Sequence, residues 1–429
     1  MRIKYRPVLV VFFWAGSVAL GQYPGGNGHA YSAERGTNWE RDVIFAGPVT
    51  ISTSNFAYDN MSLLVNGTTV TVDGAHTFQN VGVTNGGKIT HTEGDTNGLQ
   101  LTVSGTLTVA TNSSIDVSGR GNGDGGVHAY TGGSYGGRGG NCDASNVSRS
   151  CFGDCRQPLS CGGGGVYTRG GGRIKVTAEA LQLDGQILAN GICPGCWMGG
   201  SAGGAIWLDV GTLKGGGVVQ ADGGSSPGVG AGGGGGRIAI YYDSANEFNL
   251  TNAVRTWGGL GANNLPAGGG GTIYLKNKGT GAEQLLVKNR TLGPVTELGG
   301  SMSGISLILN RANMTITGAL TVADITMTNA VLVQNASLTY TTWTMLSGSI
   351  WSQNVAVSLV GYPQGGGWTL VQNAPLTLPG DALVVSNWTW VVNYHQAWTS
   401  VTVTNGGKIT NTEGDTNGLQ LTVSGTLTV

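Results

Sequence analysis

Six cysteines are the residues of this sequence whose type and spacing could most readily do chemistry. They lie close together and occur nowhere else in the chain: Cys142, Cys151, Cys155, Cys161, Cys193 and Cys196. An even, clustered set in an exported chain favours disulfide bonds, with the connectivity left open. Cys151-x3-Cys155 and Cys193-x2-Cys196 could instead supply four thiolates to zinc. The Cys193-Pro194-Gly195-Cys196 spacing also suits a redox motif, but no strand-to-helix context accompanies it. We therefore predict disulfides.

Polysaccharide cleavage is the enzymatic reaction that this sequence could most plausibly catalyse, and it requires two positioned carboxylates. Arg173-Ile174-Lys175 matches the Arg-Ile-Lys motif of polygalacturonases, a resemblance that would make these residues substrate-binding. The accompanying Asn-Thr-Asp, Asp-Asp and Gly-His-Gly motifs are absent. The acids of the repeat region are scattered singly, at Asp184, Asp209, Asp222 and Asp243. We therefore expect no catalytic residues, with a polysaccharide lyase or hydrolase as the alternative.

The histidines and one glycine-aspartate stretch are the remaining candidates for metal binding. His29, His76, His91, His128 and His395 show neither metal-ligand spacing nor a nearby nucleophile, so we expect surface or turn histidines. The stretch GNGDGG at 121–126 resembles half of a calcium-binding repeat, but such sites need stacked copies and this one occurs once. We expect a turn there, no metal ion and no cofactor.

Six tryptophans are concentrated in the last third of the chain, and their flat rings could stack on sugars. In the stretch 387–391, Trp388 and Trp390 share one face of a predicted strand. We favour packing in the core and keep glycan stacking as the alternative. The candidates are Trp343, Trp351, Trp368, Trp388, Trp390 and Trp398.

The elements that position these residues belong to an internal repeat. Gly-Gly-x-Ile units begin at Gly171, Gly203, Gly235 and Gly270, at spacings of 32, 32 and 35. Apolar residues alternate after each glycine pair, which is typical of strands with one buried face. A unit of two short strands and a glycine-rich connection cannot bury its apolar face unless it stacks on its neighbours. The sequence therefore predicts an all-β protein, a parallel β-helix or β-solenoid with glycine-rich loop insertions. One interior column should contain Ile174, Ile206, Ile238 and Ile273.

Composition and the N-terminal sequence indicate where the protein acts. Only 10% of the residues are charged, against about 25% in ordinary domains, and the net charge is -1. Nucleic-acid binding depends on clustered basic residues and is not expected. Basic residues, an apolar run over 8–15 and small residues up to Gly21 predict a signal peptide over 1–21. We expect a secreted or cell-surface protein with no membrane span after removal of the signal.

The rest of the chain divides into five further segments. They are an N-terminal β region (22–119), a Gly/Cys-rich insertion (120–172), Gly-rich solenoid repeats (173–300), a Trp-containing β region (301–402) and a truncated second copy (403–429) of the segment 83–109. The insertion could order as bundled extended helices, because glycine backbones can approach closely. The second copy differs only in having Asn411 for His91. We expect the chain to be a fragment of a longer protein.

Several glycine-rich stretches carry a family resemblance. GLQLTVSGTLTV, GGSYGGRGG, GGAIWLDVGTL and GGGGGRIAIYY, within residues 60–280, are similar to segments of large exported bacterial surface proteins. That group is largely uncharacterised, so the resemblance implies a surface location and a repeat architecture but no catalytic residues. We expect an exported structural or adhesive protein whose partners are glycans or other cell-surface components. The alternative is a carbohydrate-binding or polysaccharide-degrading β-helix protein.

Overall fold

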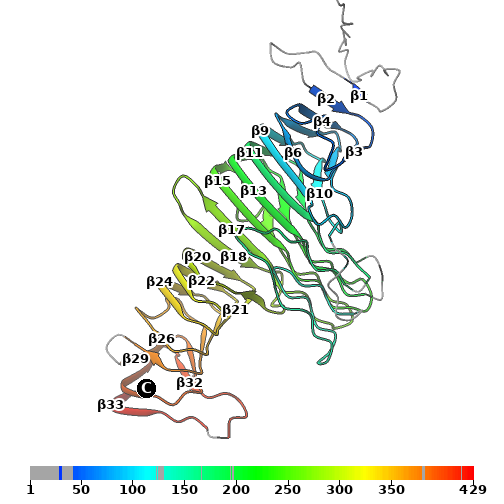
Figure 1. Ribbon diagram of the computed structural model, residues 1–429. Helices are drawn as coiled ribbons and strands as arrows, with labels where there is room; N and C mark the ends of the chain where they lie inside the picture. Colours follow the sequence, from blue (N-terminus) through cyan, green and yellow to red (C-terminus); the bar gives the residue numbers. More distant parts are fainter. Residues whose placement is uncertain are drawn as a thin grey trace, which may run out of the picture.

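The described part of the protein is an elongated all-β molecule, with β2 (Asp42–Phe45) and β33 (Thr422–Thr428) at opposite ends (Figure 1). The computed structural model describes His29–Ala30 and residues 42–429, except 122, 124–129, 166, 194, 196, 197, 379–381 and 417. The predicted signal peptide lies outside these residues. In the described segments no helix is long and apolar enough to span a membrane.

Three large sheets enclose two hydrophobic cores, and the other described strands form a 2-stranded and a 3-stranded sheet. A 14-stranded sheet runs from β1 (His29–Ala30) to β24 (Leu338–Met345). A 7-stranded sheet from β3 (Val49–Ile51) to β16 (Val254–Arg255) packs against its first part. A second 7-stranded sheet, from β19 (Thr296–Leu298) to β32 (Lys408–Thr410), packs against the rest. Nearly all strand pairs are parallel, because the chain returns to each sheet once per coil. This confirms the predicted β-solenoid.

The predicted interior column of isoleucines is confirmed. It crosses β11 (Arg173–Leu183), β13 (Ala205–Lys214), β15 (Arg237–Glu247) and β17 (Thr272–Asn277). Ile174 pairs with Ile206, Ile206 with Ile238 and Ile238 with Ile273. All four side chains are buried in one core, because alternate residues of each strand point inward.

The direction of the strands reverses at β18 (Glu283–Lys288), which pairs antiparallel with β17. The next strand of the sheet, β20 (Met302–Asn310), is parallel to β18. Leu286 belongs to the first hydrophobic core, whereas its neighbours Leu285 and Val287 belong to the second. Successive side chains of a strand point to opposite faces. Two solenoids therefore share one sheet and lie on opposite faces of it.

The second solenoid has shorter coils and a polar ladder in its core. Leu320 of β22 (Leu320–Thr328) pairs with Leu338, so one coil takes 18 residues, against 32 between Ile174 and Ile206. Gln353 and Gln372 are fully buried at the ends of β25 (Ile350–Gln353) and β27 (Thr369–Gln372). Most buried polar groups are hydrogen-bonded: Gln372 Oε1 accepts the indole N–H of Trp390 at 3.0 Å, and Gln353 Nε2 donates to Pro375 O at 2.7 Å.

The longer coils of the first solenoid contain glycine-rich segments that project as a group of extended chains from one side of the sheets (Figure 1). The predicted insertion joins this group. Gly234 donates its N–H to Gly133 O at 2.9 Å, and Gly171 donates to Ala202 O at 2.9 Å. At Gly224 an added Cβ would lie 2.6 Å from the carbonyl oxygen of Ile192. The segments thus form a hydrogen-bonded bundle of extended chains, packed at distances that side chains would prevent. Below it is called the glycine bundle.

The two copies of the 27-residue segment have the same strands but different burial. Leu107 in β9 (Leu99–Val109) is fully buried, whereas its counterpart Leu427 in β33 is 53% exposed. Strand β9 has β11 stacked on it, while β33 pairs only with β31 (Ala397–Thr404). Burial of this segment therefore depends on the next coil.

Candidate functional site

The six candidate tryptophans all lie in the second core. Trp343, Trp351, Trp368, Trp388, Trp390 and Trp398 are each at most 6% exposed. Trp368 and Trp388 stack face to face, with ring centroids 4.4 Å apart and an interplanar angle of 6°. The geometry agrees with the interpretation of these residues as core, and none of the six offers a ring face to a sugar.

The cysteines are held by separate partners. No disulfide joins any two of the five that the structure describes, and Cys196 lies outside the described residues. Cys151 contacts the backbone of residues 295 and 297. Cys155 is buried in the second core, and the thiol of Cys193 lies 3.3 Å from Met198 O. The expected disulfides are therefore not present among these five residues. Nor does the described part contain a cluster of three metal-ligating side chains.

Two of the histidines expected at the surface or in turns are instead buried. His76, on β6 (Gly74–Phe78), is 2% exposed, and its Nδ1 lies 2.9 Å from Asp59 Oδ1. His91 is fully buried, and its Nδ1 lies 2.8 Å from Thr92 O. Burial lowers the pKa of His91, against the raising effect of that hydrogen bond. His395 is at the surface as expected, while His29 and His128 lie outside the residues whose side chains are described.

Three of the four acids of the repeats form ion pairs. Asp209 and Asp243, which we expected to be isolated, both contact Lys278, whose Nζ lies 2.8 Å from Asp209 Oδ1 and 3.5 Å from Asp243 Oδ2. Asp222 accepts a hydrogen bond from Arg255 Nε at 2.7 Å. Asp184 Oδ2 accepts one from Gln182. Lys278 lies between Asp209 and Asp243, so the three side chains form an ion-pair network of one cation and two carboxylates.

The outer face of the main sheet carries basic and aromatic side chains. Lys175 Nζ lies 4.4 Å from the centroid of the Trp207 ring, and the rings of Trp207 and Tyr241 are 6.1 Å apart. The next ring along the sheet is Tyr274, 5.6 Å from Tyr241. Arg173 and Lys175, which flank the buried Ile174, point to this outer face and are half-buried. A further segment of the chain crosses the same face.

Residues 151–160 form that segment, here called the strap. Tyr241 donates its hydroxyl to Arg156 O at 3.0 Å, and Arg173 Nη1 donates to Leu159 O at 3.1 Å. The Arg156 guanidinium lies over the Tyr274 ring and forms an ion pair with Glu283 at 3.0 Å. The strap therefore binds across several coils of the first solenoid.

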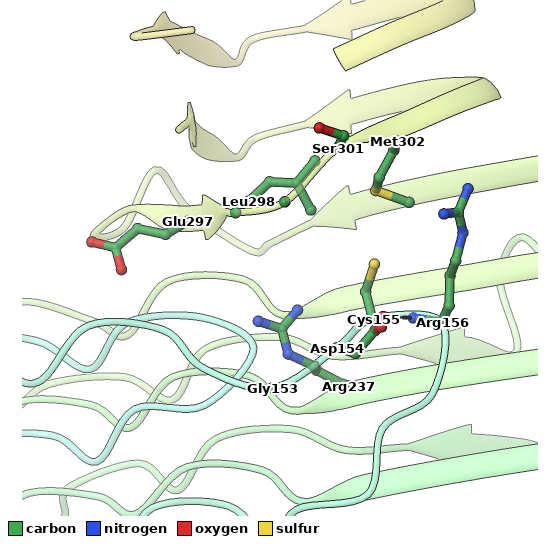
Figure 2. Close-up of a pocket in the computed structure, with 11 residues that line it drawn as sticks. Gly153, Asp154, Cys155, Arg156, Arg237, Glu297, Leu298, Ser301 and Met302 are labelled. Atoms are coloured by element: carbon green, nitrogen blue, oxygen red, sulfur yellow. Dashed lines mark hydrogen bonds between the residues drawn. The ribbon is translucent and has the colours of Figure 1, made fainter. Parts of the chain in front are cut away.

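A pocket of about 250 Å³ lies where the strap meets the junction of the two solenoids (Figure 2). It is lined by Gly153–Arg156 of the strap, by Arg237 at the start of β15, and by residues 297–302 from β19 to β20. The rim residues Gly153, Asp154 and 299–301 are exposed, whereas Cys155, Leu298 and Met302 are buried. The pocket therefore has an open mouth and a buried floor.

Arg237 is the unusual residue of this floor, because it is only 3% exposed. Its Nε donates to Phe152 O at 2.9 Å, its Nη1 donates to Thr272 Oγ1 at 2.9 Å, and its guanidinium lies over the Tyr135 ring. None of the ion pairs in the described part of the chain includes it. Lys, Arg, Asp and Glu side chains are seldom fully buried without a charged partner.

Sequence reasoning did not single out Arg237. It follows a Gly-Gly pair in the same way as Arg173, and the two residues occupy the same register position two coils apart. The strap contacts both arginines, but only Arg237 lies beside Thr272, the Tyr135 ring and the β19–β20 segment. The same column contains Arg173, Ala205 and Thr272, so the position of Arg237 in the repeat gave no signal.

No known protein family matches this chain, nor does any curated protein or solved structure with which it was compared. The resemblance to bacterial surface proteins is thus supported only in its architecture, namely long parallel sheets with strands stacked in register.

Proposed function

We propose that this chain is a structural or adhesive component of a cell surface or of the material outside cells. The observation that supports this proposal is the stacking of coils in two solenoids that share one sheet and together extend from β2 to β33 (Figure 1). The strands of each coil pair with those of the adjacent coils, so such a body gains length and contact surface by adding coils. The low content of charged residues and the N-terminal signal-like sequence agree with a location outside the cell.

Immunolabelling of intact cells tests the location. Antibodies raised against the purified chain should label unpermeabilised cells of the source organism, or the material around them. Antibody preabsorbed with the chain is the control. Labelling that requires permeabilisation would contradict the proposal.

Carbohydrate binding is a second candidate, and the neighbouring rings of Trp207 and Tyr241 on the outer face favour it. Aromatic rings at an interface with water combine apolar area with polar edges. Trp207 and Tyr241 are partly exposed. A panel of plant, algal and bacterial glycans, scored both for binding and for release of reducing or unsaturated ends, separates the candidates. Binding of a glycan without release of reducing or unsaturated ends favours a binding module. Release of such ends that is abolished by mutating one acidic residue favours an enzyme.

A further inference from the structure

The pocket at the junction of the two solenoids contains a positive charge that the described part of the protein does not neutralise. Guanidinium groups carry five N–H donors and remain charged in proteins. Two of the Arg237 donors are used, on Phe152 O and Thr272 Oγ1, and the side chain lines the pocket. The remaining N–H donors of the Arg237 guanidinium are therefore available to a ligand in the open pocket.

The carboxylates that line the pocket are occupied elsewhere. Glu297 Oε2 accepts the N–H of Cys151 at 2.8 Å, and its Oε1 lies 3.6 Å from Arg138 Nη1. In Figure 2 the Glu297 side chain extends away from Cys155 and Arg156. Asp154 Oδ1 accepts the backbone N–H of Arg156 at 2.7 Å. Neither acid therefore serves as the counter-ion of Arg237.

The other charged or ionisable groups nearby do not compensate Arg237 either. Arg156 is paired with Glu283, which also accepts a hydrogen bond from Lys276 at 2.9 Å. Burial raises the pKa of Glu283, but the hydrogen bonds from Lys276, Tyr274 and Arg156 outweigh it and hold that pKa below its usual range. Burial also raises the pKa of the Cys155 thiol, which keeps it uncharged at neutral pH. Arg237 thus remains without a charged partner at the floor, while the carboxylate of Asp154, which pairs with no cation among the described residues, lies at the exposed rim.

We propose that this pocket binds a small oxyanion, a carboxylate or sulfate group, which Arg237 holds from the floor. Oxyanions of this kind match the fork of N–H donors that a guanidinium presents. The volume of about 250 Å³ is below the ~300–1,000 Å³ typical of pockets that enclose a whole organic ligand. One acidic group enters it, either as a free ion or as the substituent of a larger glycan. The proposal does not depend on the location of the protein.

Isothermal titration calorimetry on the full chain tests the proposal, with sodium sulfate, sodium galacturonate and neutral galactose as probes at constant ionic strength. One sulfate or galacturonate should bind per chain, and galactose should not. The Arg237→Lys variant keeps the positive charge but loses the planar set of guanidinium N–H donors. Its affinity for sulfate and galacturonate should therefore be at least about tenfold lower. The Arg311→Lys variant, altered at an exposed arginine outside the pocket, should bind like the unaltered chain.

A second variant keeps the test valid if Arg237 proves necessary for folding. Ser301 lines the mouth and is exposed, so Ser301→Glu leaves the fold intact and places a negative charge beside the entering anion. Its affinity should fall severalfold, whereas Ser358→Glu, at an exposed position outside the pocket, should have no effect. Absence of saturable binding to the unaltered chain, or equal affinities for Ser301→Glu and Ser358→Glu, would overturn the proposal.

Titration with an acidic polymer shows whether the bound acidic group belongs to a glycan or is a free ion. Polygalacturonate that binds with higher affinity per chain than galacturonate supports an acidic glycan as the natural ligand, and fully methyl-esterified polymer serves as its control. Binding of the free anions alone supports a small ion at the same site.

Discussion

Substituting one glycine of the glycine bundle should destabilise the protein far more than substituting an exposed one. In Gly224→Ala the new Cβ would lie 2.6 Å from Ile192 O, whereas ordinary contacts begin at 3.4 Å. The neighbouring carbonyl must therefore move by about 0.8 Å, and overpacking of this kind costs about 1–3 kcal/mol. The same oxygen accepts hydrogen bonds from Ser201 N at 3.0 Å and from Ser201 Oγ at 2.8 Å. Weakening both brings the expected loss to about 2–4 kcal/mol.

Gly216→Ala is the matched control. Gly216 is exposed, and an added Cβ there would meet nothing within 4 Å. Its replacement should leave stability unchanged, or raise it by about 0.4–1 kcal/mol by restricting the unfolded chain. The stability of both variants is measured by urea unfolding followed by far-ultraviolet circular dichroism. Their midpoints can be compared if the free energy of unfolding depends on urea concentration with the same slope in both. If the two alanine variants differ by less than about 0.5 kcal/mol, the close packing of the glycine bundle does not limit stability.

Three further outcomes are expected. Gln372→Leu leaves the buried indole N–H of Trp390 without its acceptor and should lower the free energy of unfolding by about 2–4 kcal/mol; a change below about 0.5 kcal/mol in urea titrations would contradict this. Burial lowers the pKa of His91 from 6.5, so the unfolded chain takes up the proton more readily, and the stability present above pH 6.5 is lost as the pH falls below it. In His91→Asn the urea midpoint should therefore change less between about pH 7.5 and pH 5 than it does in the unaltered chain. An equal pH dependence of the midpoint in both chains would show that His91 is not the group responsible. Iodoacetamide should label Cys142 before the buried Cys155 in the folded chain, as read by peptide mass analysis; labelling of both only after a reductant is added would show that they are oxidised.

Local patterns in the sequence were sufficient to predict the coils. The glycine-pair spacing and the alternation after it placed Ile174 and Ile206 in one column, because a period of two has only one arrangement that buries the apolar face. The same alternation indicated that Trp388 and Trp390 face inward together.

The reversal at β18 was not predicted, because alternation is the same in parallel and antiparallel strands. A signal was present in Leu285-Leu286-Val287, three consecutive apolar residues that indicate burial on both faces. The pocket could not be predicted, because Arg237 and Phe152 lie 85 residues apart and their contact leaves no local pattern.

The strap imposes an order in time on the folding of this chain. Its Cys151 N–H bonds to Glu297, 146 residues later, while the coils themselves contact their neighbours. At synthesis rates of ~5–20 residues per second, the docking partner emerges roughly 7–30 s after the strap. Until then the contacts of the Cys151 thiol with residues 295 and 297 cannot form. We therefore expect the compartment in which the chain folds to influence the redox state of Cys151.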